Sequence, residues 1–111
     1  MSSTNTLPAQ RKSRDRASTQ RRVLMLLRAV GQDENVSDIS YVISERTGEP
    51  YESVRRRAYS LIEQGYLSGT LVDGRTVVKR TEKGDALMAE LSGVVARRAA
   101  IDQRIDNASA L

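Results

Sequence analysis

Three consecutive arginines, Arg55 to Arg57, offer the most chemistry in this chain of 111 residues. A guanidinium group can hold a guanine edge or a phosphate through two parallel hydrogen bonds. If Val54 points inward on a helix, Arg56 points outward and the other two lie on its flanks. We predict polyanion contacts for Arg55 and Arg56, whereas Arg57 suits a phosphate or an ion pair within the protein equally well. The alternative is a solvated helix face with pairs such as Glu52 with Arg56.

Further polar side chains lie near these arginines and in a β-prone segment after them. Tyr51 can pack on a sugar, and Ser53 can bond a base or a phosphate. Tyr59 can donate to a phosphate, although a partly buried surface tyrosine fits it equally well. Arg75 can reach a narrow minor groove, whereas a strand charge such as Lys79 often only protects a sheet edge. The predicted DNA-contacting set is Tyr51, Ser53, Arg55, Arg56, Arg57, Tyr59, Arg75 and Lys79.

Two amphipathic segments joined by a short turn must position these side chains. The first is expected to begin at Ser37 as N-cap and to end at Gly48. The second is expected to run from about Pro50 to Gln64, since a proline in the first helical turn lacks only an N–H that has no partner there. A helix, a turn and a second, basic helix form a helix-turn-helix, which places its second helix in the DNA major groove.

The segments around this motif predict one more helix before it and a hairpin after it. Apolar residues repeat at helical spacing from about Ser18, and Gly31 is a plausible stop. The β-prone runs 70–72 and 76–78 are separated by Asp73-Gly74, a strong signal for a two-residue hairpin turn.

Thr81 is expected to cap a long final helix from Glu82 to about Ile105. Its apolar residues recur every three or four positions, which predicts a seam against a second copy of the chain. The first turns are expected to pack on their own domain instead, and such packing is the alternative for the whole stripe. The predicted dimer interface comprises Leu91, Val94, Val95, Ile101 and Ile105.

The composition excludes several kinds of site. There is no Cys and no His, so disulfides, ordinary zinc or iron sites and Ser–His or Cys–His nucleophile pairs are excluded. We expect no catalytic residue, metal or cofactor. Without Phe or Trp the core must use aliphatic residues and four Tyr, and a small core of this kind favours association with a second copy. The absence of a long apolar run predicts a soluble, cytoplasmic protein without a membrane partner.

The charge is uneven along the chain. Residues 1–28 hold seven basic residues and one acidic residue, and residues 29–50 hold one basic and five acidic residues. Residues 51–80 hold six basic and three acidic residues, and residues 81–111 hold four basic and five acidic residues. Two basic blocks around an acidic one suit a polyanionic partner met by one face. We predict a disordered basic arm over 1–16, which either follows phosphates or only adds solubility, a DNA-binding domain over 17–81, and a dimerisation helix with a tail over 82–111.

In this order the features resemble the winged helix-turn-helix family of transcription regulators, from about Ser18 to Glu90. The resemblance rests on Thr47-Gly48, on the arginines 55–57, on the phrase 61–67 before the hairpin and on the phrase 80–84 after it. The last phrase is similar to that of the small dimeric MarR and PadR groups. MarR proteins have more helix around the module, so a minimal PadR-like, phage or plasmid regulator fits the length better.

The resemblance implies a mainly α (α+β) winged helix-turn-helix with a two-stranded wing and a long C-terminal helix. It also implies a homodimer held by terminal helices, with the basic helix in the major groove and the wing on the backbone or minor groove. We therefore expect a sequence-specific regulator of double-stranded DNA that represses by occlusion. The rivals are an adaptor whose basic helix meets an acidic protein and a non-specific DNA-organising or plasmid or phage maintenance protein. An enzyme is least favoured, because the carboxylates, serines and three lysines form no cluster.

Overall fold

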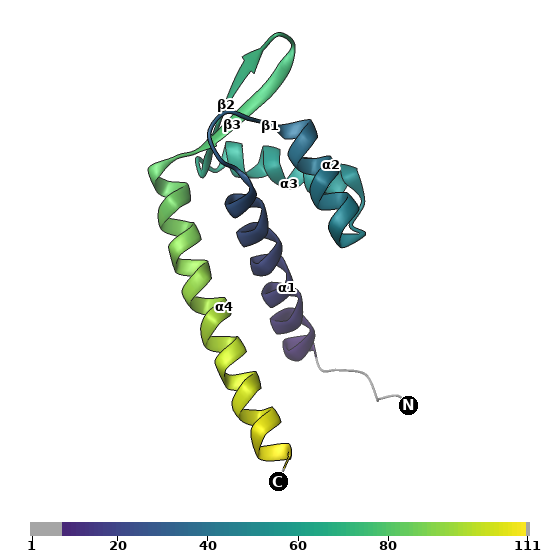
Figure 1. Cartoon of the computed structure of the whole chain (residues 1–111), viewed down its shortest axis with the longest axis vertical. Coiled ribbons are helices and arrows are strands. Elements are labelled where there is room, and N and C mark those ends of the chain that lie inside the picture. Colours follow the sequence, from purple (N-terminus) through teal and green to yellow (C-terminus); the bar gives the residue numbers. More distant parts are fainter. Residues whose placement is uncertain (1–7, 111) are drawn as a thin grey trace.

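A computed structural model describes the backbone of residues 8–110 and the side chains of residues 16–110. The elements are α1 (Pro8–Ala29), β1 (Glu34–Asn35), α2 (Val36–Thr47), α3 (Tyr51–Glu63), β2 (Leu67–Val72), β3 (Arg75–Arg80) and α4 (Glu82–Ser109). In Figure 1, α1 and α4 lie side by side along the long axis, and α2, α3 and the hairpin gather at one end. This arrangement confirms the predicted winged helix-turn-helix with a long C-terminal helix. Within the described residues, no helix is long and apolar enough to cross a membrane.

The first helix begins earlier than the sequence predicted. It starts at Pro8 instead of near Ser18, so it includes part of the arm 1–16 that was expected to be disordered. Proline is well suited to a first helical turn, and the Ala, Gln, Arg and Lys residues after it favour helix despite their polarity. Residues 1–7 of the predicted arm lie outside the described residues.

The start of α2 was predicted two residues too late along the polar run before it. Asn35, not Ser37, is the N-cap, and its Oδ1 accepts hydrogen bonds from the backbone N–H groups of Ser37 at 2.8 Å and Asp38 at 3.4 Å. Asn and Ser are equally good caps, so local sequence could not choose between them. The strand β1, which the sequence did not predict, selects Asn35 as the N-cap, because pairing with Val77 holds Asn35 in an extended conformation. The predicted stop of α2 is confirmed: Gly48 has φ 77° and donates to the carbonyl of Ser44.

The three strands form an antiparallel sheet in the order β1-β3-β2. Asp73 and Gly74 both have positive φ, 50° and 77°, and join the paired residues Val72 and Arg75. This is the predicted two-residue turn, whose twist matches that of the strands. Both strands are longer than the predicted runs, since pairing continues to Leu67 opposite Arg80.

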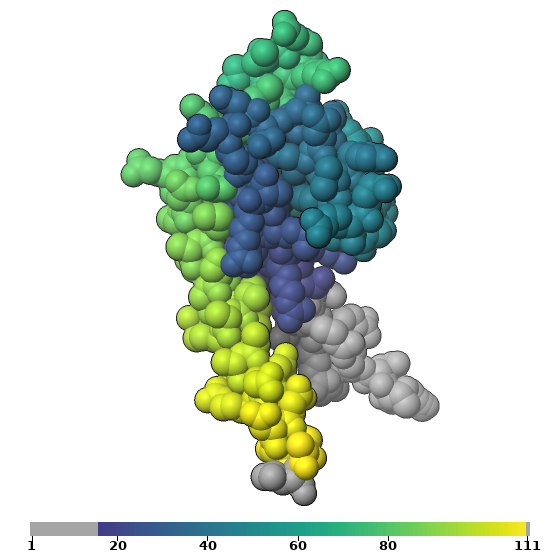
Figure 2. All heavy atoms as spheres, in the orientation of Figure 1, coloured from purple at the N-terminus to yellow at the C-terminus, as the bar shows by residue number. Residues whose placement is uncertain are grey.

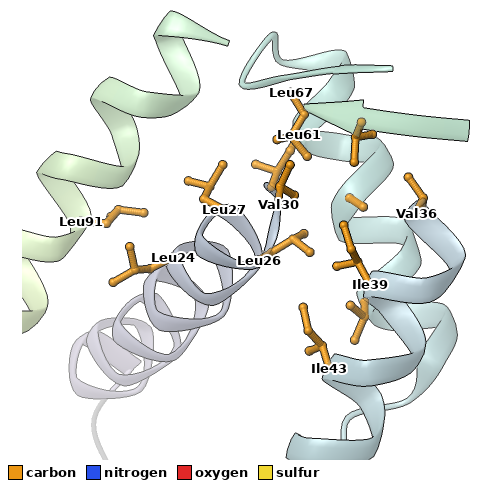
Figure 3. Close-up of a cluster of buried hydrophobic side chains, with 13 residues drawn as sticks. Leu24, Leu26, Leu27, Val30, Val36, Ile39, Ile43, Leu61, Leu67 and Leu91 are labelled. Carbon is orange, nitrogen blue, oxygen red and sulfur yellow. The ribbon is translucent and has the colours of Figure 1, made fainter. Parts of the chain in front are cut away.

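A single aliphatic cluster joins the helices to the base of the wing (Figure 3). α1, α2 and α3 supply three members each, Val30 directly follows α1, and only Leu91 comes from α4. The buried residues are Leu24, Leu26, Leu27, Val30, Val36, Ile39, Ile43, Val54, Ala58, Leu61, Leu67, Val78 and Leu91. The core thus sets the angle between the helix-turn-helix and the wing, and the far half of α4 lies outside it.

Gly84 allows the first turn of α4 to lie directly against the backbone between α3 and the wing. A Cβ at this position would overlap the carbonyl oxygen of Tyr66. We expect Gly84→Ala to lower the free energy of unfolding by about 3 kcal/mol, because backbone must move to relieve the overlap. Gly93→Ala in the same helix is the control, since its Cβ would meet only the Arg97 guanidinium at 3.5 Å. Urea unfolding should show Gly93→Ala as neutral or stabilised by up to about 1 kcal/mol. Equal stability of the two variants would contradict this account of Gly84.

Candidate nucleic-acid interface

The helix α3 presents one side to the core and the opposite side to solvent. Val54, Ala58 and Leu61 are buried, whereas Arg56 is exposed. The hairpin lies beside this helix, and the space-filling view shows it projecting beyond the helices at one end of the molecule (Figure 2). The exposed side of α3 and the adjoining wing therefore form one surface.

Glu49 fixes the turn that leads into α3. Its backbone carbonyl accepts a hydrogen bond from Ser44 Oγ at 2.7 Å, and its backbone N–H donates to Thr47 Oγ1 at 3.1 Å. Its carboxylate, only 9% exposed, receives both terminal nitrogens of Arg57, with the Nη1 to Oε1 distance 3.1 Å, and lies 3.8 Å from Arg22. One side chain thus connects α1, the turn and α3.

This geometry changes the interpretation of Arg57. Its side chain is 17% exposed and its guanidinium holds Glu49 with two bonds, so a phosphate would have to displace an internal partner. Of the two roles predicted for this residue, the structure shows the ion pair within the protein. Arg57 therefore holds α3 against the turn.

Hydrogen bonds from Arg57 hold the pKa of the Glu49 carboxyl below its ordinary value. Burial of the carboxyl raises this pKa, and the positive charges of Arg57 and Arg22 lower it further. A carboxyl whose pKa is lowered by folding stabilises the fold above its unfolded pKa of about 4.3, and this contribution disappears as the pH falls through the folded pKa.

We expect Glu49→Gln to cost about 2 kcal/mol at pH 7, because a largely buried guanidinium loses its partner. The stability difference from the unsubstituted protein should shrink as the pH falls from 5 toward 3. Urea unfolding at several pH values measures both effects. Glu52→Gln, which changes an exposed carboxylate in the first turn of α3, should stay within about 0.5 kcal/mol. A Glu49→Gln difference independent of pH would contradict the assignment.

Arg55 and Arg56 differ in how they are held. The Arg55 guanidinium lies 5.0 Å from the centre of the Tyr59 ring and 3.5 Å from Glu52, and its side chain is 43% exposed. Arg56 is exposed and makes no ion pair among the side chains of residues 16–110. The pair of Glu52 with Arg56 considered from the sequence is therefore replaced by Glu52 with Arg55. Arg55 is oriented toward the wing, and Arg56 is available to a partner.

Tyr59 connects α3 to the wing. Its hydroxyl donates to Thr76 Oγ1 at 3.0 Å, and its ring packs against the core cluster. Because its only hydroxyl proton is donated to Thr76, the structure favours the partly buried tyrosine over the phosphate donor.

The other two predicted residues of α3, Tyr51 and Ser53, lie on different sides of the helix. Tyr51 is half-buried at the first position of α3. Ser53 is half-buried and faces α1, where it lines a cleft of about 640 Å³ between α1, α3 and α4. Arg56 reaches the rim of the same cleft. Ser53 and Arg55 therefore lie on opposite flanks of the helix.

The predicted wing residues lie on the outer face of the hairpin. Arg75 and Lys79 are exposed and pair with Val72 and Ser68, so they occupy the face opposite buried Leu67. Lys79 lines a hollow together with Asp33. Sequence reasoning missed the residue at the tip on the other face, Leu71, whose side is set by the two-residue turn.

Arg80, at the end of the wing, has an internal role. It donates to the carbonyl oxygens of Leu27, at 2.8 Å, and Val30, and to Asp85 Oδ1 at 2.7 Å. These bonds satisfy the last carbonyls of α1, which a helix end leaves without partners. They also fasten the wing to the long helices.

The predicted dimer residues divide along α4. Leu91 is buried in the core of its own chain, so it offers little surface to a partner. Val95 packs partly against that core and Val94 is half-buried, whereas Ile101 and Ile105 are 47% and 57% exposed. The apolar groups that a partner could still cover lie in the distal half of the helix.

No protein-family model matches the sequence, and no curated protein shows a significant match to it. The solved structures that are similar in fold include the following three. Sso10a-2, a DNA-binding protein from Sulfolobus solfataricus, has 18% identity and a TM-score of 0.69, over 82% of this chain and 92% of its own. SSV1 F-93 has 13% sequence identity and a TM-score of 0.55, and the match covers 74% of this chain and 91% of its own. The multiple antibiotic-resistance repressor (MarR) from Listeria monocytogenes has 18% sequence identity and a TM-score of 0.55, and the match covers 89% of this chain and 72% of its own. The helix-turn-helix, the hairpin beside it and these similarities identify the chain as a protein of the winged helix-turn-helix fold.

Proposed function

We propose that this protein binds double-stranded DNA by placing α3 in the major groove with the wing beside it. The observation that carries the proposal is the pair Arg55 and Arg56 on the solvent side of α3. Arg56 is exposed, and Arg55 is aligned over Tyr59 toward the wing. The Glu49–Arg57 pair holds the start of the same helix, so these arginines are presented by a rigid element.

The similar solved structures support the same class of function. One of them is described as a DNA-binding protein and another as a repressor. At 13% to 18% identity they share the fold with this chain, and the argument for DNA rests on its own arginines.

The charges on α3 favour a sequence-specific regulator over a protein that only coats DNA. Its exposed residues include Glu52 and Glu63 as well as Arg56. Carboxylates close to phosphates repel them and so disfavour binding to arbitrary sequence. Hydrogen bonds between the arginines and a matching base edge offset this repulsion at a specific site. We therefore propose that it regulates transcription in the cytoplasm, as a repressor that occludes its site.

We further propose that the protein acts as a homodimer joined through the distal half of α4. Ile101 and Ile105 supply the exposed apolar groups, with Val94 at the edge of the seam. A two-fold dimer of this kind would place two copies of α3 about 34 Å apart, one turn of DNA, and read a near-palindromic site.

Selection from a pool of random duplexes at a stated salt concentration tests the proposal. We expect a near-palindromic consensus, with an affinity that falls linearly in log salt as phosphate counterions are released. Steep salt dependence without a consensus would indicate the DNA-organising role instead. No retention of any duplex at low salt would exclude DNA as the partner and favour the protein-binding adaptor.

A further inference from the structure

Leu71 is an exposed leucine at the tip of the wing. Its side chain is 73% exposed, the most of any large apolar residue in the described chain. The charges of the tip, Asp73 and Arg75, cancel. A tip without net charge gains little from phosphates, so its main feature is apolar surface.

The register of the hairpin places Leu71 on the side of the wing that faces α3. Leu71 pairs with Thr76 across the strands, and directly opposed residues project on the same face of a sheet. Thr76 accepts the hydroxyl of Tyr59, so this face is turned toward the helix. Two residues before Leu71 on the same face, a Cβ at Gly69 would lie 3.1 Å from Ile62 of α3.

These contacts form one continuous row from helix to wing tip. Arg55 lies over the ring of Tyr59, Tyr59 bonds Thr76, and Thr76 pairs with Leu71. Arg75, the wing residue favoured from the sequence, pairs with Val72 and therefore lies on the opposite face. Leu71, and not Arg75, is therefore the tip residue on the side of the wing that faces α3.

The reach of the hairpin is comparable to the step from one groove to the next. Leu71 lies four residues along β2 from buried Leu67, roughly 13 Å at 3.3 Å per residue. Neighbouring major and minor grooves are about half a helical turn apart, roughly 17 Å. A helix in the major groove therefore brings the wing tip over the adjacent minor groove.

We propose that Leu71 is an apolar minor-groove contact that inserts beside a base step and bends the duplex. The proposal rests on the proposed DNA binding through α3. Apolar side chains pushed between base steps partly unstack them, and flexible pyrimidine–purine steps yield most easily. Leu71 would thus add a preference for deformable sequence next to the bases read by α3.

Val72→Ala is the matched control for Leu71→Ala, because Val72 is also exposed at the tip but lies on the outer face. The probe is a duplex of about 30 base pairs recovered by selection, with fluorophores at both ends to report bending and 2-aminopurine at the steps flanking the α3 site. We expect Leu71→Ala to weaken binding about tenfold and to abolish both the bend and the 2-aminopurine signal. Val72→Ala should remain within about twofold in affinity and keep both signals.

Equal behaviour of the two variants, or an unbent duplex with the unsubstituted protein, would overturn the role of Leu71 while leaving α3 binding intact. Absence of duplex binding by the unsubstituted protein would overturn both proposals. Thermal unfolding of the two variants should match that of the unsubstituted protein, because both side chains are exposed.

Discussion

Substitution of both outward arginines, Arg55→Ala/Arg56→Ala, is expected to reduce affinity for a selected duplex by a factor of roughly 30 to 20,000. Each arginine that holds a base edge contributes about 1 to 3 kcal/mol of discrimination, and tenfold in affinity corresponds to about 1.4 kcal/mol. Fluorescence anisotropy at one fixed salt concentration measures the change. Neither side chain is in the core, so the unfolding midpoint should be nearly unchanged.

Arg46→Ala/Arg97→Ala is the control for this prediction, because it removes the same charge from exposed positions on α2 and α4. Its affinity should fall by only a few-fold through the weaker long-range field. If the two double variants lose equal affinity, net charge and not the surface of α3 is responsible for binding. Unchanged affinity of Arg55→Ala/Arg56→Ala would remove the mechanism altogether.

The second large effect is expected from the distal half of α4. Ile101→Asp/Ile105→Asp places two charges on the exposed apolar groups of the proposed seam. Sedimentation equilibrium should show a monomer at concentrations where the unsubstituted protein is a dimer. Affinity for a palindromic site should fall about 100-fold, because the second α3 no longer binds as part of the same complex.

Ala96→Asp/Ala100→Asp adds the same charges to exposed positions of the same helix, away from the isoleucines. This variant should stay dimeric. A monomeric unsubstituted protein, or dissociation of the alanine variant alone, would refute the proposed seam.

The sequence predicted those parts of the fold that local chemistry determines. Gly48, with its positive φ, ends α2, Asp73-Gly74 forms a two-residue turn, and Thr81 caps α4 by accepting from the N–H of Gly84 at 3.0 Å. In each case the conformation depends on a few neighbouring residues. The two-residue strand β1 was missed, because so short a segment has no periodicity and exists only through its pairing with β3.

The site was harder to predict, because some of its side chains form hydrogen bonds and ion pairs with residues that are distant in the sequence. The sequence could not show that Arg57 is held by Glu49, eight positions away across a turn, or that Tyr59 donates to Thr76 in the wing. Helical periodicity correctly places Arg56 outward, since that depends on α3 alone. Leu71 was missed because the role proposed for it depends on the face of the wing on which it lies, and the hairpin register that sets this face is known only from the structure.

The most direct test of the central claim, that the surface of α3 and the wing binds duplex DNA, is to map backbone amide chemical shifts while a selected duplex is added. The largest perturbations are predicted in α3 from Tyr51 to Glu63 and in the wing from Leu71 to Thr76, with α2 residues such as Tyr41 little changed. Perturbations confined to α2 or to the distal half of α4, or none at duplex concentrations that saturate binding, would contradict it.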